Sequence, residues 1–75
     1  MDRGDIVTTP NIEGKKITDY LGVVYAREDS ADKVFDAVIQ QAEGLGANKI
    51  VGFQLDWQSP KRFYGSGTAV IVVDA

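Results

Sequence analysis

The chain has 75 residues, of which 44% are hydrophobic and 25% are charged, so it suits one folded domain over residues 1–75 and excludes a disordered chain. Eight Lys and Arg against eleven Asp and Glu leave a net charge of −3, which offers no basic surface to a nucleic acid. Since the chain has no Cys and no His, it lacks disulfides and the ligands that zinc and softer metals prefer.

The first third of the chain predicts two strands separated by a polar loop. Residues 6–9 are β-prone and stop at Pro10, which fixes φ and removes a backbone donor, so we expect a short edge strand there. Residues 17–26 alternate, with Val23 and Tyr25 on one side and Val24 and Ala26 on the other. This pattern predicts a strand with two partly apolar faces.

An amphipathic helix is expected next, over residues 30–45. Apolar residues recur there at spacings of three and four from Val34 to Leu45. Asp29 or Ser30 can accept hydrogen bonds from the first-turn amides, and Gly46 can adopt the left-handed conformation that ends a helix.

The last third of the chain predicts a hairpin. Residues 49–57 alternate strictly, which would place Val51, Phe53, Leu55 and Trp57 on one face. Residues 58–62 form the predicted turn around Pro60, and residues 63–73 form the last strand. Its apolar run, 69–73, is too unbroken for a strand with one wet face, so we expect it to be covered on both sides.

This order predicts an α+β fold, a two-layer ββαββ sandwich in which a small antiparallel or mixed sheet carries one helix on one face. One helix cannot cover both faces, and an exposed apolar face usually marks an interaction surface. Small domains without disulfides often gain stability from a partner chain. We therefore expect a homo-oligomer that buries the second face against copies of itself.

Four stretches in chain order resemble the YbjQ-like family, which carries a heavy-metal-binding label. The most specific one combines Thr8, Thr9 and Pro10 with the following Ile12, Glu13 and Gly14; the four stretches are residues 6–17, 20–24, 42–52 and 65–70. The resemblance implies a dodecin-like subunit and a homopentameric ring. Typical members are longer, with a charged helical insertion before residues 42–46, so this chain looks like a shortened member.

Because the chain has no Cys and no His, a metal site in it could use only hard oxygen ligands. Carboxylates could gather at a subunit interface to hold a divalent ion such as calcium or magnesium. The candidates are Glu13, Asp19, Glu28 and Asp56. The alternative is an ordinary solvated acidic surface.

Two further stretches are candidate binding sites for small molecules. Thr8, Thr9, Asn11 and Glu13 could line a pocket for an unidentified ligand, or residues 8–14 could simply form a turn with an unusual φ at Gly14. By analogy with the dodecins, Trp57 and Gln58 could hold flavin by stacking and an amide contact, a weaker hypothesis than the divalent metal ion. The alternative is that Trp57 packs in the core or an interface.

We expect no enzyme. Gly65, Ser66, Gly67 and Thr68 lack the lysine of a phosphate loop and open a strand, so close backbone packing explains them better. No serine has a histidine to act as its base. With no apolar run near the roughly 20 residues of a membrane span, and no apolar signal at Met1 to Asp5, we expect a cytoplasmic protein that does not bind membranes.

Overall fold

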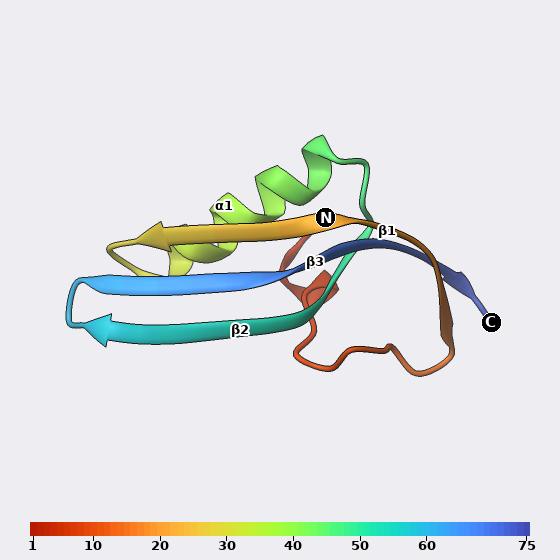
Figure 1. The fold of residues 1–75 in the computed structure, drawn as a ribbon, viewed down its shortest axis with the longest axis horizontal. Coiled ribbons are helices and arrows are strands. Elements are labelled where there is room, and N and C mark those ends of the chain that lie inside the picture. Colours follow the sequence, from red (N-terminus) through yellow and green to blue (C-terminus); the bar gives the residue numbers. More distant parts are fainter.

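The computed structural model describes all of residues 1–75, and Figure 1 shows a three-stranded sheet with one helix behind it. The elements are the 3-10 turn η1 (Arg3–Asp5), β1 (Lys15–Glu28), α1 (Ala31–Gly44), β2 (Lys49–Ser59) and β3 (Arg62–Asp74). The sheet order is β1-β3-β2, and both pairings are antiparallel. The predicted two-layer α+β architecture is confirmed. The turn between β2 and β3 is tighter than predicted, because the strands extend to Ser59 and Arg62.

The predicted first strand is wrong, so the fold is βαββ and not ββαββ. Within residues 6–14, which we call the N-terminal arm, only Ile6 forms an isolated parallel bridge, to Ile50. The arm still follows the edge of β2: Val7 N donates to Ile50 O at 2.9 Å, and Gly52 N donates to Thr9 O at 2.8 Å. Regular pairing stops because Gly52 has a φ of +62° and Pro10 has no backbone donor.

The helix is confirmed, and its ends have the predicted caps. Ser30 is extended, with its Oγ accepting from Lys33 N at 3.3 Å, and Gly46 has a φ of +85°. The buried stripe of α1 is Val34, Val38 and Ala42. This stripe packs on one face of the sheet, where the larger core cluster forms.

The close approach of α1 and β2 to β3 depends on two glycines of β3. A Cβ at Gly65 would clash with Val34 Cγ1 and lie 2.8 Å from Phe53 Cζ. A Cβ at Gly67 would lie 2.7 Å from Ile50 Cγ2. The sequence-based interpretation of these glycines as sites of close packing is confirmed.

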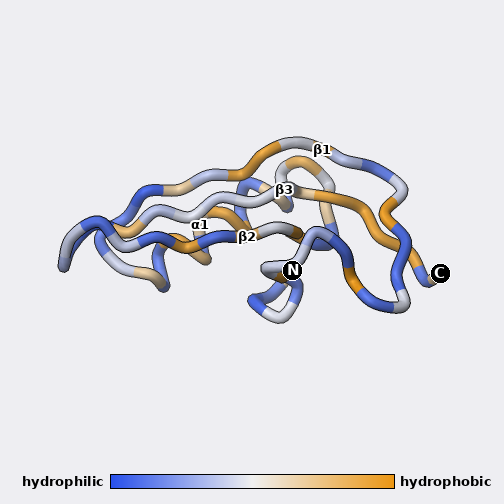
Figure 2. The backbone as a smooth tube through the Cα atoms, turned by 60° about the horizontal axis from the view of Figure 1, so that its bottom comes forward, coloured by the Kyte–Doolittle hydropathy of each residue, from blue (hydrophilic) through white to orange (hydrophobic).

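A second, smaller cluster lies on the sheet face away from the helix. Val51, Val70 and Val72 are buried there, with Val7, Ile12 and Ile17 packed against them. Figure 2 shows the apolar second half of β3 running through this region. The prediction that this run is covered on both sides is confirmed for Ala69, Val70 and Val72. The arm and the start of β1 supply that cover within the same chain.

Bulges break the strict alternation that the sequence predicts. The β2–β3 register shifts between Val51 and Gln54, around the positive φ of Gly52. As a result Ile50 and Phe53 share the helix-facing cluster, while Val51 belongs to the other one. The predicted common face for Val51 and Phe53 is therefore wrong, because a bulge inserts one extra residue and reverses the faces beyond it.

An ion pair ties η1 to the start of β2, and it predicts a dependence of stability on pH. Lys49 Nζ donates to Asp5 Oδ1, and each side chain is about a quarter exposed. This hydrogen bond, supported by the one from Asp2 N, lowers the pKa of the Asp5 carboxyl below its usual value. A carboxyl with a lowered folded-state pKa stabilises the fold above its unfolded pKa of about 3.9, and loses that contribution as the pH falls through the folded value.

We therefore expect Lys49→Met to be less stable than the wild type at neutral pH, with the difference shrinking in acid. Urea unfolding of both proteins at a series of pH values, from neutral to acid, measures this difference in the free energy of unfolding. Pairs shared by both proteins, such as Asp29 with Lys33, cancel in the comparison. A difference that stays constant with pH would contradict the role of this pair.

Candidate functional surface

Half of the sheet face away from the helix stays uncovered. We call it the open half-face, and it lies toward the β2–β3 turn, beyond the reach of the arm. Three residues of β1 there are strongly exposed: Tyr20 by 71%, Val23 by 75% and Tyr25 by 54%. The strand register places six further residues on the same face: Arg27 of β1, Gln54 and Asp56 of β2, and Tyr64, Ser66 and Thr68 of β3.

Bonds within the chain already satisfy part of each sheet edge. On β1, the Gln41 side chain of α1 donates to Tyr25 O at 2.6 Å and accepts from Tyr25 N at 2.9 Å. On β2, the arm occupies the edge near Gly52. Such covering discourages strand-to-strand pairing between molecules.

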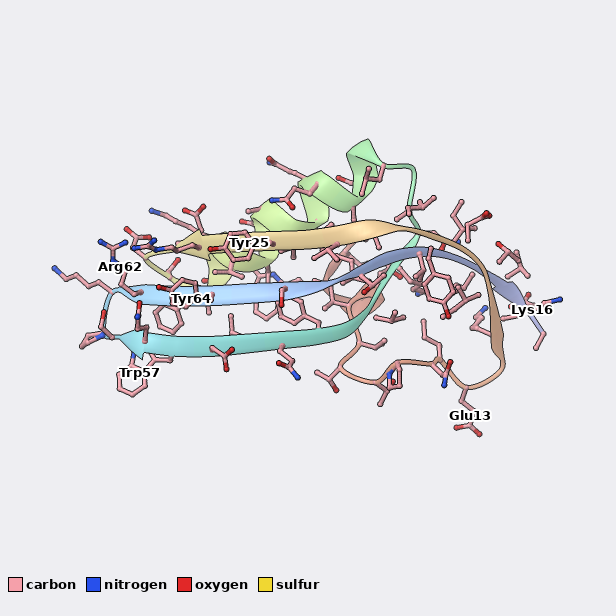
Figure 3. The ribbon with its side chains drawn as sticks, in the orientation of Figure 1. Glu13, Lys16, Tyr25, Trp57, Arg62 and Tyr64 are labelled. Carbon is pink, nitrogen blue, oxygen red and sulfur yellow. The ribbon has the colours of Figure 1, made fainter.

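The candidate flavin residues, Trp57 and Gln58, lie near the end of β2, next to the β2–β3 turn. Figure 3 shows Trp57 at this end of the sheet. Trp57 is 65% exposed, so the alternative that placed it in the core of one chain is wrong. Tyr64 Oη donates to Gln58 Oε1, so the amide oxygen of Gln58 already has a partner. The surface of the chain has two hollows, and neither residue lines either of them. Flavin binding at Trp57 and Gln58 stays a prediction.

The candidate metal ligands do not come together within one chain. No group of three or more carboxylates is placed to hold an ion. Glu13 lies at the opposite end of the molecule from Trp57, the neighbour of Asp56 (Figure 3). Asp19 lies on β1 opposite Ile71 of β3, and Glu28 ends β1. The four candidate carboxylates therefore do not form one site within this chain.

The candidate ligand loop belongs to the arm and behaves as the predicted turn. Thr8, Thr9, Asn11 and Glu13 are all exposed. Thr9 Oγ1 donates to Asn11 O at 2.6 Å, and Gly14 has a φ of +75°. Neither hollow of the chain is lined by any of these residues.

A charged hollow, which the sequence analysis did not predict, lies at the end of the molecule that holds the β2–β3 turn. It has a volume of about 440 Å³, and its lining contains no hydrophobic residue. The lining residues are Arg27, Glu28, Asp29, Lys33, Lys61 and Arg62. They come from the end of β1, the first turn of α1 and the β2–β3 hairpin, so no local motif could reveal them. We call this site the hairpin hollow.

Electrostatics inside the hairpin hollow are dominated by one internal pair and three free cations. Lys33 Nζ lies 3.0 Å from Asp29 Oδ1, and this hydrogen bond lowers the pKa of Asp29 and raises the pKa of Lys33. Arg27 lies over the Tyr64 ring, 5.6 Å from its centroid. Lys61 and Arg62 form no ion pair.

A UPF0145 protein of Methanocaldococcus jannaschii is 37% identical to the chain over 78 residues, covering 87% of this chain and 88% of that protein. The chain belongs to the UPF0145 family. YbjQ-like is another name for the same family, so the resemblance noted in the sequence is confirmed at the level of the family. No family model matches the chain.

Among solved structures, the UPF0145 chain is similar to a protein of unknown function in the DUF74 family, from Pediococcus pentosaceus. The two share 20% sequence identity, with a TM-score of 0.47 over 93% of this chain and 96% of that one. No helix of the UPF0145 chain is both long and apolar enough to cross a membrane.

Proposed function

We propose that this UPF0145 protein works as a homo-oligomer, and that the open half-face is its self-association surface. The observation that supports this most is the row of exposed apolar and aromatic side chains at Tyr20, Val23 and Tyr25. Large exposed side chains grouped on one flat surface are typical of protein interfaces. Only 13 of the 75 residues are buried in the single chain, so a partner would add substantially to a small core.

A second copy of the same chain fits this surface by charge. Arg27 on β1, Tyr64 on β3 and Asp56 on β2 form one row across the sheet. The row is basic at one edge and acidic at the other, so a head-to-tail contact brings opposite charges together. Head-to-tail contacts that close on themselves form rings. The resemblance to the YbjQ-like family implies five subunits.

The proposed role is structural or ligand-binding, in the cytoplasm, and not catalytic. Ligands or divalent ions would be held where subunits meet. The support for this is Trp57, a large aromatic side chain near the end of β2 that is 65% exposed in the single chain.

Sedimentation velocity at micromolar concentration tests the assembly. We expect the wild type to sediment as an oligomer and Val23→Glu to sediment as a folded monomer, because the carboxylate would be buried without a partner in the interface. Val23 is 75% exposed in the single chain, so the change leaves the fold of the monomer intact.

The matched control is Val73→Glu, which places the same change at an exposed valine near the end of β3, outside the open half-face. We expect this variant to keep the oligomer. A wild type that remains monomeric, or equal dissociation of both variants, would contradict the proposed surface.

A further inference from the structure

The hairpin hollow gathers the positive charge that this acidic chain leaves unpaired. Four of the eight Lys and Arg residues line it, against two of the eleven Asp and Glu. Elsewhere the cations are mostly paired: Arg3 bonds Asp32, Lys15 bonds Asp74 and Lys49 bonds Asp5. The cations without a carboxylate partner are Lys16, Arg27, Lys61 and Arg62.

Three of those four unpaired cations line one concavity, and the fourth, Lys16, lies at the other end of the molecule (Figure 3). Like charges repel, so side chains of one sign do not gather in a hollow to stabilise the fold. Asp29, one of the carboxylates in the lining, already forms an ion pair with Lys33. Glu28, the other carboxylate of the lining, forms no ion pair, so four cations stand against two carboxylates, and an anion from outside would offset the remaining positive charge.

From this arrangement we infer that the hairpin hollow binds a small phosphate-bearing molecule. A guanidinium presents paired donors to phosphate oxygens, and Arg62 supplies such a group at the start of β3. Arg27, which also belongs to the row proposed for self-association, lines the same hollow from the end of β1. Lys61 adds a flexible point charge from the turn. The first turn of α1 borders the same hollow at Lys33, where the helix dipole also favours negative charge.

The surroundings favour a small ligand over a nucleic acid strand. The hollow has a volume of about 440 Å³, which accommodates a phosphate or diphosphate group. Glu28 and Asp29 stand in its lining, and the chain carries a net charge of −3. A long polyanion leaving the hollow would be repelled, because few other cations are unpaired.

Titration calorimetry with inorganic pyrophosphate at low salt tests the inference. We expect the wild type to bind, and the double variant Lys61→Gln, Arg62→Gln to bind at least about tenfold more weakly after losing two charge-assisted contacts. Both residues are exposed at the hairpin, so the variant should fold, and urea unfolding checks this. Lys16→Gln is the matched control and should bind like the wild type, because it removes an unpaired cation far from the hollow.

Two further titrations test whether the phosphate group comes from a lipid or from a nucleic acid. One presents phosphatidic acid in phosphatidylcholine vesicles, and the other a single-stranded oligonucleotide. No pyrophosphate binding by the wild type, equal weakening by the Lys16 control, or binding to vesicles or oligonucleotide that pyrophosphate does not displace would each overturn the inference. The double variant Lys61→Gln, Arg62→Gln changes no residue of the open half-face and should sediment like the wild type, so the site can be judged apart from the assembly.

Discussion

Gly65→Ala is expected to lower the free energy of unfolding by about 2–3 kcal/mol, because it overpacks the core. The new methyl group would lie 2.8 Å from Phe53 Cζ and clash with Val34 Cγ1. Both neighbours are buried, so neither can move aside without disturbing the packing of α1 on the sheet. Urea unfolding followed by circular dichroism measures the change.

Gly44→Ala is the control for this prediction. Gly44 is the last residue of α1, and a Cβ there meets nothing within 4 Å. Alanine should therefore leave the stability unchanged or raise it by up to about 1 kcal/mol, because alanine favours the helix over glycine. Equal destabilisation by both substitutions would show that the close approach at Gly65 is not what the fold requires.

Ile50→Ala is expected to cost about 3–4 kcal/mol of the free energy of unfolding. Ile50 is completely buried between the sheet and α1 and is the largest such side chain in the chain. Its truncation leaves a cavity beside Gly67, on the helix side of the sheet. For a domain of 75 residues, a loss of this size is a large share of the total stability.

Ile50→Val serves as the graded control, with an expected loss of about 1 kcal/mol, since it removes one methylene and keeps the β-branched shape. Both variants are compared by urea unfolding at one protein concentration, because self-association would add to the apparent stability. A loss below about 1 kcal/mol for Ile50→Ala would contradict a single tightly packed core on the helix side.

The N-terminal arm changes the argument for self-association. From the sequence, one helix leaves a whole sheet face to be covered by other copies. In the structure, Val7, Ile12 and Ile17 already cover Val51, Val70 and Val72. Only the half bearing Tyr20, Val23 and Tyr25 remains open, so the proposed interface is smaller and lies at one end of the sheet.

Several features of this protein could be predicted from local pattern alone. The period of three to four residues from Val34 to Leu45, with Ser30 before it and Gly46 after it, defined the helix because capping and amphipathicity act over neighbouring residues. The apolar run 69–73 predicted a strand covered on both sides, which is confirmed for Ala69, Val70 and Val72, whereas Val73 is 46% exposed. The four family stretches also identified the UPF0145 family correctly.

The candidate sites could be predicted less well from local sequence patterns. Trp57 was expected to pack or to bind flavin, but its exposure depends on how far α1 reaches along the sheet. The sequence suggests Glu13 and Asp56 as ligands of one metal ion. The sequence does not show how far apart they lie along the molecule. Distances between such residues are set by the pairing of strands, which local patterns do not encode.

The sequence by itself determined the two-layer α+β class, the helix and its caps, and the glycines that allow close packing, since each depends on residues near one another in the chain. Only the tertiary structure decided that residues 6–9 form an arm and not a strand, that a bulge at Gly52 separates Val51 from Phe53, and that Arg27, Lys33, Lys61 and Arg62 meet in one hollow. These features arise where the antiparallel hairpin and the end of β1 bring distant segments side by side.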